Sequence, residues 1–390
     1  FFEHLRALHQ GSDGKVGVHG DAWQGTGAQL WHALDNALEA LFAASSVVQG
    51  EDQWRGSAAL ADELEILGRR AEKIRQELAD IVEASSEFVA WVELSERNVE
   101  LSASPVELAP VLQRQLFEAI PATILTSATL CDSARRSAED PPAAAADGKP
   151  SAYRFMRQRL GLDELTSQVM ELVVPTPFDF ENRALLYVPE DLPIPGEPGF
   201  PGKAAQRAQQ LIDITDGGAF VLTTSLKAMR EIHGELRRAD NQRLLLLQGE
   251  APKHVLLDRF RAQGNAVLVA TLSFWEGVDV PGKSLRLVIM DKVPFAVPTD
   301  PILRARAEKL ENAGRSGFRD LYLPLAQRLL KQGFGRLIRH HDDAGVVAVL
   351  DARLRQKGYG KRLLAALPPA PVVGTLPEVS RFWSRYSGST

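Results

Sequence analysis

Two arginines and a glutamine near the C-terminal end are spaced so that one helix would present all three on one side. Gln332, Arg336 and Arg339 stand at i, i+4 and i+7 of an expected helix over residues 324–340. Guanidinium groups are planar, permanently charged, bidentate donors, so such a pair fits the phosphates of a nucleoside triphosphate. A helix end whose cations offset the helix dipole explains the same residues. The spacing alone leaves both interpretations open.

A second candidate site begins where an expected strand over residues 266–271 ends. Thr271 closes this strand, and Glu276, Gly277 and Asp279 follow it. Parallel sheets carry their ligands beyond the carboxyl ends of the strands, which is where these residues would lie. Glycine allows a close backbone approach, and the carboxylates accept hydrogen bonds from hydroxyl groups or arginines. A turn with acidic caps explains each residue singly, but explains the set less well.

Residues 277–284 also match the phosphate-loop pattern G-x-x-x-x-G-K-S. A working phosphate loop opens a helix whose first amides surround the phosphate. Here the mostly apolar residues 285–290 predict a buried strand instead, and Pro281 removes an amide from the loop. We therefore expect that this segment is not a phosphate loop.

Two hydrophobic patterns divide the elements that must position these residues. Over residues 60–81, apolar residues alternate steps of four and three, which predicts a long helix in a hairpin or bundle. After residue 152, short apolar strands alternate with helices, which predicts a parallel sheet covered on both faces. The expected strands are residues 184–188, 219–223, 244–247, 266–271, 285–290 and 345–350. The expected sheet-facing residues of the 324–340 helix are Ala326, Leu330, Gly333 and Leu337.

The segment between these two regions is harder to assign. Residues 106–120 are expected to be helical, and residues 123–130 to form a strand followed by a turn. Residues 131–151 are rich in Pro and Ala and are expected to be a linker or loop.

Composition sets further limits. The 390 residues carry a net charge of −5, so no global basic field attracts nucleic acid, and any DNA contact must come from local patches. The single cysteine, Cys131, excludes an internal disulfide and a cysteine-ligated zinc or iron–sulfur site within these residues. No apolar run reaches membrane-spanning length, and a cytoplasmic location is expected. The first residues look like the middle of a protein.

Four motifs then occur in a fixed order: residues 126–130, 273–282, 292–301 and 332–339. Together they resemble the XPD/DinG branch of superfamily 2 helicases, most closely the YoaA-like bacterial subgroup, over about residues 85–370. The resemblance implies an α/β, RecA-like second motor domain without its own Walker A, plus an N-terminal helical arch. Family members also carry a Walker A, a four-cysteine iron–sulfur domain and a D-E-A-H box, all expected to precede this chain. Alone, the chain is expected not to hydrolyse ATP.

The resemblance also implies roles for single residues. Catalysis would fall to Arg336 and Arg339, which would neutralise charge on the γ-phosphoryl group. The implied nucleotide-binding residues are Gln332, Glu276, Gly277 and Asp279, and the implied DNA-binding residues are Thr224, Ser225, Thr271, Ser127 and Thr129. No metal ligand is expected among them. A polar turn at residues 127–129 and a helix cap by Ser225 are the structural alternatives.

The same resemblance implies a 5′-to-3′ DNA helicase of repair or replication that acts on single-stranded or forked DNA. ATP and Mg²⁺ would be held mainly by a first motor domain, and a 4Fe-4S cluster would lie in the preceding region. The expected division is residues 1–105 as the arch, 106–150 as a remnant of motor domain 1 with a linker, 151–368 as motor domain 2, and 369–390 as a tail. Phe382 and Trp383 in this tail could contact the χ subunit of the DNA polymerase III clamp loader.

Two alternatives stay open at this stage. Basic residues near Tyr359, among them Arg353 and Arg355, could follow a nucleic-acid backbone, or could form a solvated helix face. The whole chain could also be a non-catalytic module that binds nucleic acid or a replisome protein.

Overall fold

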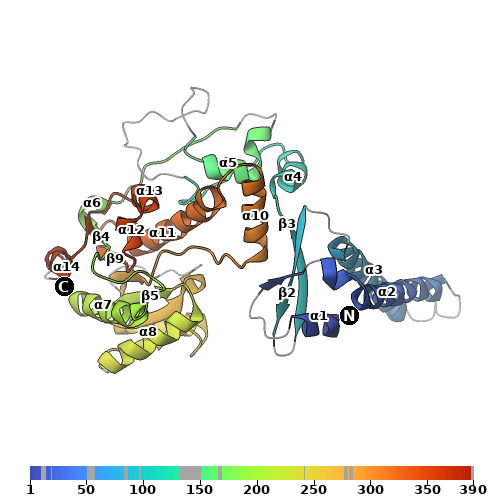
Figure 1. The fold of residues 1–390 in the computed structure, drawn as a ribbon, viewed down its shortest axis with the longest axis horizontal. Coiled ribbons are helices and arrows are strands. Elements are labelled where there is room, and N and C mark those ends of the chain that lie inside the picture. Colours follow the sequence, from blue (N-terminus) through green and yellow to red (C-terminus); the bar gives the residue numbers. More distant parts are fainter. Residues whose placement is uncertain are drawn as a thin grey trace. The chain divides into compact units, whose positions relative to one another are not determined.

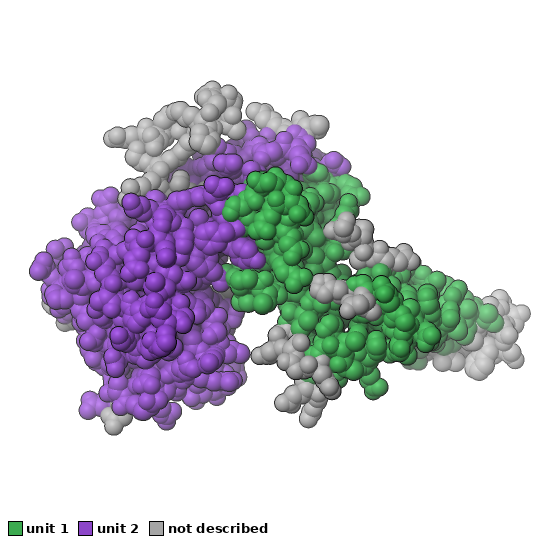
Figure 2. Space-filling model, viewed as in Figure 1, with its two compact units in different colours: residues 1–115, 296–317 green, residues 116–295, 318–390 purple. Residues whose placement is uncertain are grey.

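The computed structural model describes residues 1–9, 15–18, 20–50, 58–82, 87–95, 98–131, 151–165, 169–240, 242–275, 280 and 284–387. Of residues 21, 48–50, 58–61, 275 and 336, only the backbone is described. The chain forms two compact units, drawn in two colours in Figure 2. Unit 1 is Phe1–Gln115 with Ala296–Gly317, and unit 2 is Leu116–Phe295 with Phe318–Thr390.

A hairpin of two long helices is one part of unit 1. Helices α2 (Thr26–Gly50) and α3 (Ala58–Val82) pack along each other, and an Arg75–Asp35 ion pair of 3.0 Å joins them. The predicted seam of α3 is only partly correct. Ala71 and Leu78 are buried, whereas Leu67 and Ile74 are nearly half exposed, because a single partner helix covers only a narrow stripe.

A three-stranded antiparallel sheet is a second part of unit 1. Its strands are β1 (Lys15–Gly17), β2 (Phe88–Leu94) and β3 (Val99–Pro105), and Leu5, Val18, Ala90 and Val92 form its core. The shorter helical elements of this region are α1 (Phe2–Leu8), η1 (Gly20–Trp23), α4 (Ala109–Leu112) and η3 (Gln113–Phe117).

Unit 1 also contains α10 (Pro301–Asn312), which comes from a distant part of the sequence. The Arg306 Nε atom donates to the Val106 carbonyl oxygen at 2.7 Å, and Lys309 pairs with Glu107 at 2.9 Å. These long-range contacts attach residues 296–317 to unit 1, although the sequence predicted them to belong to the second motor domain.

Unit 2 contains a seven-stranded sheet in the order β10-β4-β9-β8-β5-β7-β6, and all of its pairings are parallel. The strands are β4 (Ala184–Tyr187), β5 (Ala219–Thr223), β6 (Leu245–Leu247), β7 (Val267–Thr271), β8 (Leu287–Met290), β9 (Gly345–Val349) and β10 (Val372–Val373). Every residue of β4, β5, β8 and β9 is buried, as expected of strands covered on both faces. The predicted parallel α/β architecture is confirmed.

Helices cover both faces of this sheet (Figure 1). One face packs on α7 (Phe200–Thr215), α8 (Leu226–Ala239) and α14 (Leu376–Trp383). The other packs on α9 (Lys253–Gln263), α11 (Leu323–Leu337) and α13 (Gly358–Ala366). The shorter elements are α5 (Arg154–Leu160), η5 (Leu162–Glu164), α6 (Phe180–Arg183), η6 (Leu272–Trp275), η8 (Phe318–Tyr322) and α12 (Arg353–Gln356).

Two predicted features differ from the structure. Residues 123–127 form no strand and the Ile124 side chain is 90% exposed, since no strand of the unit 2 sheet pairs with this segment. The predicted tail, in contrast, is folded. Val372 and Val373 form the edge strand β10, and Val379 and Phe382 of α14 are buried against the sheet.

Among the described residues, no helix combines the length and the apolar character that crossing a membrane requires.

Candidate functional site at the carboxyl edge of the parallel sheet

The carboxyl ends of β5 and β8 lie next to each other at the centre of the unit 2 sheet. From β5 the chain continues through α8 toward β6, while from β8 it continues through α11 to β9, in the opposite direction. The two helices cover opposite faces of the sheet. Adjacent strands whose connections diverge in this way leave a crevice, and parallel α/β sheets bind ligands in such crevices.

A buried carboxylate, Asp291, joins the two strand ends. Its side chain is only 2% exposed. Its Oδ1 atom accepts the backbone N–H of Thr224 at 3.1 Å and that of Lys292 at 2.9 Å. Burial raises the pKa of Asp291 from 3.8 to about 6, although the Lys292 ammonium and these hydrogen bonds oppose the shift. The sequence reasoning missed Asp291, whose only signal was an acid directly after an apolar strand.

The hydroxyl residues after β5 divide into structural and accessible groups. Thr223 is buried and its hydroxyl donates to the Ser225 carbonyl oxygen at 3.0 Å. Ser225 is exposed, and its Oγ atom accepts the Ala228 amide at 3.2 Å, which makes it the N-cap of α8. The predicted cap is therefore confirmed. The Ser225 hydroxyl can still donate its own proton, and the first amides of α8, apart from that of Ala228, have no partner within the helix, as at the start of any α-helix.

Thr271 ends β7 in a small polar network. Its backbone N–H and its hydroxyl both donate to the Gln248 side-chain oxygen, at 2.8 and 2.9 Å. The Ser273 hydroxyl lies 2.8 Å from the Thr271 hydroxyl. Gln248, which follows β6, was not predicted as a site residue. These polar groups lie at the same carboxyl edge as Thr224 and Asp291, because β5 and β7 pair in parallel as far as Thr223 and Thr271.

Asp351, the second residue after β9, is fully buried and holds the next part of this edge in place. It accepts the Val293 N–H at 2.9 Å and the Arg353 guanidinium at 2.7 and 2.9 Å. The Arg353 guanidinium also lies over the Phe295 ring, 6.0 Å from its centroid. Arg353 is thus held by protein groups, which disagrees with a role in following a nucleic-acid backbone.

Three aromatic rings continue this network toward the connections to unit 1. The Phe295 and Phe318 centroids are 5.5 Å apart, and both rings contact Tyr359, at 5.6 and 5.4 Å. Phe295 and Phe318 are the last and the first unit 2 residues on either side of the 296–317 segment.

The arginine motif lies at the end of α11. Ala326, Leu330 and Leu337 are buried in the core, and a Cβ built on Gly333 would stand 2.0 Å from the Met290 Cε atom, so the predicted sheet-facing side is correct. The helix, however, ends at Leu337 and Ile338 is extended. Asp343 accepts the backbone N–H groups of Arg339 and His340 at 2.8 Å, which stabilises the turn beyond the helix.

The predicted three-residue helical face is therefore wrong in one member. Gln332 and Arg336 lie on α11, but Arg339 lies beyond its end. From Gly333, which packs over the carboxyl end of β8, the helix runs toward Leu337, which packs against the start of β9 at Gly345. The C-terminal end of α11 therefore lies near the amino end of β9, and Arg339 comes two residues after that helix end. The Arg336 side chain lies outside the described residues.

Some of the remaining predicted site residues lie outside the described residues, and others have a structural role. Glu276, Gly277 and Asp279 lie outside the described residues. The strand β8 that follows them agrees with the prediction that residues 277–284 do not open a helix. The Ser127 Oγ atom accepts the Thr129 N–H at 3.1 Å within an exposed turn, as the structural alternative predicted. Just beyond this turn, the Lys331 ammonium of α11 donates to the Cys131 carbonyl oxygen at 2.6 Å.

Comparison with known proteins relates this chain to helicases. Residues 208–370 match the family described as Helicase C-terminal domain. The ATP-dependent DNA helicase YoaA of Escherichia coli strain K12 is 40% identical over 292 residues, which are 75% of this chain and 42% of that protein. YoaA of Haemophilus influenzae is 35% identical over 320 residues, 82% of this chain and 47% of that protein. The chain thus spans less than half the length of these two relatives.

A further relative and a solved structure agree with these matches. The ATP-dependent helicase DinG of Mycobacterium tuberculosis strain H37Rv is 36% identical over 290 residues, 72% of this chain and 40% of that protein. The solved structure titled XPD_Helicase has a TM-score of 0.56 at 15% identity, and the match covers 95% of this chain and 60% of that one. The parallel sheet of unit 2 is RecA-like, and the chain is a YoaA-like relative of the XPD/DinG-type superfamily 2 helicases.

Proposed function

We propose that this chain is the C-terminal part of an ATP-dependent 5′-to-3′ DNA helicase of DNA repair or replication, acting in the cytoplasm. The observation that carries the proposal is the switch point of the unit 2 sheet. It lies within the residues that match the helicase C-terminal domain and places Thr224, Ser225 and Asp291 together. The ATP site would form between unit 2 and a first motor domain from a preceding region.

Single-stranded or forked DNA would contact the carboxyl edge of the sheet. A helix N-terminus presents unpaired amides and a positive dipole end, which suit a phosphate. At α8 these amides are joined by the Ser225 hydroxyl and by Lys227, which is exposed at the second helical position. The Thr224 amide donates to Asp291 Oδ1 at 3.1 Å and its hydroxyl donates to Asp291 Oδ2 at the longer distance of 3.5 Å, so Thr224 would contribute its hydroxyl by exchanging this weaker contact for a phosphate. We assign Thr271, Ser127 and Thr129 to the same DNA path.

We assign Gln332, Arg336 and Arg339 to the nucleotide, with Glu276, Gly277 and Asp279 nearby; Arg339 would reach it from beyond the end of α11 rather than from the helix. An arginine that neutralises the transferring phosphoryl group contributes about 10³–10⁵ in rate. Among the described residues, no group of three or more His, Cys, Asp or Glu side chains is arranged for a metal ion, so Mg²⁺ would be held by the first motor domain. The 4Fe-4S cluster of the family would likewise lie in that region.

Two segments of unit 2 have exposed apolar side chains that a further sheet, outside the described residues, would cover. Ile124 is highly exposed, and in the segment over residues 169–177 the alternate side chains of Met170, Leu172 and Val174 are 70–86% exposed. The other side of the second segment is held by Arg157, which pairs with Glu171 at 3.0 Å. Apolar side chains exposed at every second residue are typical of a β-strand whose partner strands are missing. Both segments would add strands to the first motor domain.

The experiment replaces Arg336 and Arg339 singly by alanine in the longer protein and measures DNA-stimulated ATP hydrolysis. We expect a loss of about 10³-fold for the residue that reaches the phosphoryl group. The control is Arg238→Ala, which removes an exposed arginine of α8 paired with Glu235. Near-normal turnover in both variants would contradict the assigned roles. The coding DNA before Phe1 must also contain a Walker A, four cysteines and a D-E-A-H-type box.

The alternative is a non-catalytic module that binds nucleic acid or a replisome protein. It is favoured by the strand, rather than a helix, that follows residues 277–284. Contact with the χ subunit would then depend on Trp383, which is half-buried, since Phe382 is buried against the sheet. If χ binding in a pull-down survives Trp383→Ala, this contact is wrong.

A further inference from the structure

A cavity of about 580 Å³ lies beyond the carboxyl ends of β4 and β10, two strands away from the switch point. Its walls are Tyr187 and the two acids that follow β4, Arg207 of α7, Arg355 of α12, and residues 372–378. Its volume falls within the range of sites that enclose small molecules. Nothing in the proposed helicase activity uses this cavity.

One of its two arginines is fully used by the protein. The Arg207 guanidinium donates to both oxygens of Asp191, at 3.0 and 2.7 Å, and to the Tyr187 hydroxyl. Burial raises the pKa of Tyr187, so this hydroxyl stays neutral and completes a closed set of contacts. Arg207 therefore forms a wall and not a ligand-binding group.

Arg355 is different. Its Nη1 atom donates to Glu190 at 2.7 Å, but its Nε and Nη2 atoms are buried and have no hydrogen-bond partner among the described residues. These two N–H groups form one edge of the planar guanidinium, which is the edge that binds a carboxylate with two parallel hydrogen bonds. A buried donor without an acceptor destabilises the folded protein, so this edge is suited to an acceptor from outside the chain.

The charges of the side chains that line the cavity limit which ligand could accept hydrogen bonds from Arg355. Glu190, Asp191 and Glu378 border the cavity against the two guanidiniums, so a dianion or a DNA strand would be repelled. The same acids would attract a positive or hydroxyl donor on the far end of a ligand. We infer that the cavity binds a small carboxylate that also carries such a donor, of which an α-amino acid is the simplest example.

Calorimetric titration of the 390-residue chain with L-lysine, lysine methyl ester, inorganic phosphate and a single-stranded DNA oligonucleotide tests the inference. We expect saturable binding of lysine at about millimolar affinity, as befits so small a ligand. The ester, which lacks the carboxylate, should bind at least about tenfold more weakly.

Two variants locate the site. Arg355→Lys keeps a cation beside Glu190 but removes the bidentate edge, and should weaken lysine binding about tenfold or more. Gly374→Val narrows the cavity beside Arg355, where a Cβ would stand 3.5 Å from Nη2, and should have a similar effect. The control Arg238→Lys should bind as the wild type does. Absence of saturable lysine binding, equal binding by the ester or by Arg355→Lys, or preferential binding of phosphate or DNA at this cavity would overturn the inference.

Discussion

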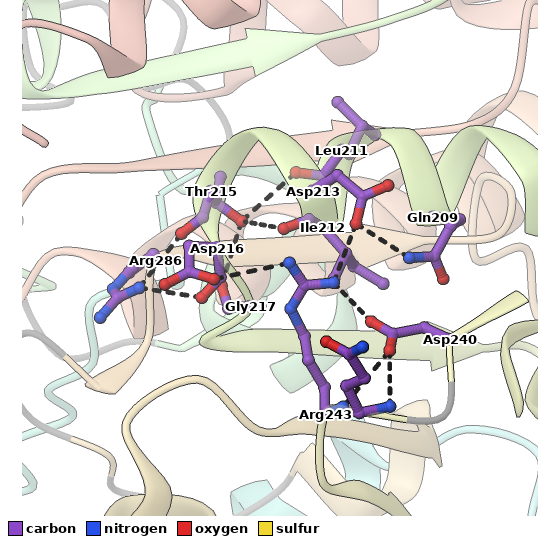
Figure 3. Close-up of polar contacts among 11 residues, drawn as sticks. Gln209, Leu211, Ile212, Asp213, Thr215, Asp216, Gly217, Asp240, Arg243 and Arg286 are labelled. Atoms are coloured by element: carbon purple, nitrogen blue, oxygen red, sulfur yellow. Dashed lines mark hydrogen bonds and ion pairs between the residues drawn. The ribbon is translucent and has the colours of Figure 1, made fainter.

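The two edges of the unit 2 sheet use charged residues in opposite ways. At the amino edge, Arg243 donates to Asp213 at 2.8 Å and to Asp240 at 2.5 Å, and lies 3.5 Å from Asp216 (Figure 3). Nearby, Arg286 donates to the carbonyl oxygens of Thr215 and Asp216, at 3.1 and 3.0 Å, where α7 ends. Cations thus meet the negative end of a helix and its acids.

At the carboxyl edge the polarity is reversed. The acids Asp291 and Asp351 point inward, are buried, and accept backbone N–H groups. Exposed groups at this edge are the Ser225 hydroxyl and the start of α8. At the amino edge the charged side chains pair with one another and stabilise the fold. At the carboxyl edge the buried acids hold loop backbone in place, and hydroxyl and amide donors are left for a ligand.

The largest effect should come from titrating Asp291. Its pKa in the folded protein is about 6 against 3.8 ordinarily, so the folded state binds the proton more tightly than the unfolded chain. The free energy of unfolding should therefore fall by roughly 2–3 kcal/mol as the pH rises from about 4 to about 6, and stay lower above that.

The variant Asp291→Asn keeps an acceptor for Thr224 and should lose this part of the pH dependence. Urea unfolding of both proteins across pH 4–8 measures it, with pH values chosen to span the titration. An unchanged slope in Asp291→Asn would show that other groups cause the dependence.

Substitutions at the amino edge should lower the unfolding free energy without changing DNA binding. Arg243→Ala leaves three carboxylates close together, and because the arginine is only partly exposed we expect a loss of about 1–2 kcal/mol in unfolding free energy. Arg261→Ala, at an exposed pair with Asp258, is the matched control and should cost at most about 0.5 kcal/mol. Binding of a fluorescent single-stranded oligonucleotide should not change. A clear loss of DNA affinity in Arg243→Ala would break the proposed division between the edges.

The smallest effect concerns Ser225, where stability and binding are separable. Ser225→Ala removes the N-cap and should cost about 1 kcal/mol. Ser225→Asp keeps the cap but adds a negative charge, so it should preserve the thermal midpoint while weakening DNA binding. Ser225→Asn should preserve the midpoint without adding the charge. If Ser225→Asp binds DNA as tightly as the wild type, the start of α8 is not a phosphate contact.

The sheet of unit 2 was predictable because its central strands are short apolar runs bounded by helices. β10 was not, since two valines after a proline-rich stretch become a strand only beside β4. The attachment of α10 to unit 1 depends on contacts across about 200 positions of sequence, which no local pattern records. The end of α11 at Leu337 likewise depends on Asp343, which accepts the backbone N–H of Arg339. No local sequence pattern indicates this contact.

The candidate site was predicted in its position and only partly in its residues. The sequence places Thr271 at a strand end and the family resemblance points to Ser225, and the structure has both residues at the carboxyl ends of neighbouring strands, while their roles in DNA binding stay a prediction. Asp291 and Gln248 were missed because their roles arise from neighbouring strands, and a single polar residue after a strand is common.

The segment between Phe295 and Phe318 affects how the two units could be exchanged by recombination or separated by proteolysis. Unit 1 is assembled from two stretches, so the chain passes between the units three times. A single crossover between genes could not exchange unit 1 as a whole, and a single proteolytic cut near residue 115 would not release it. Since the rings of Phe295 and Phe318 are already in contact, a short linker between them would allow unit 2 to be made as an independent piece.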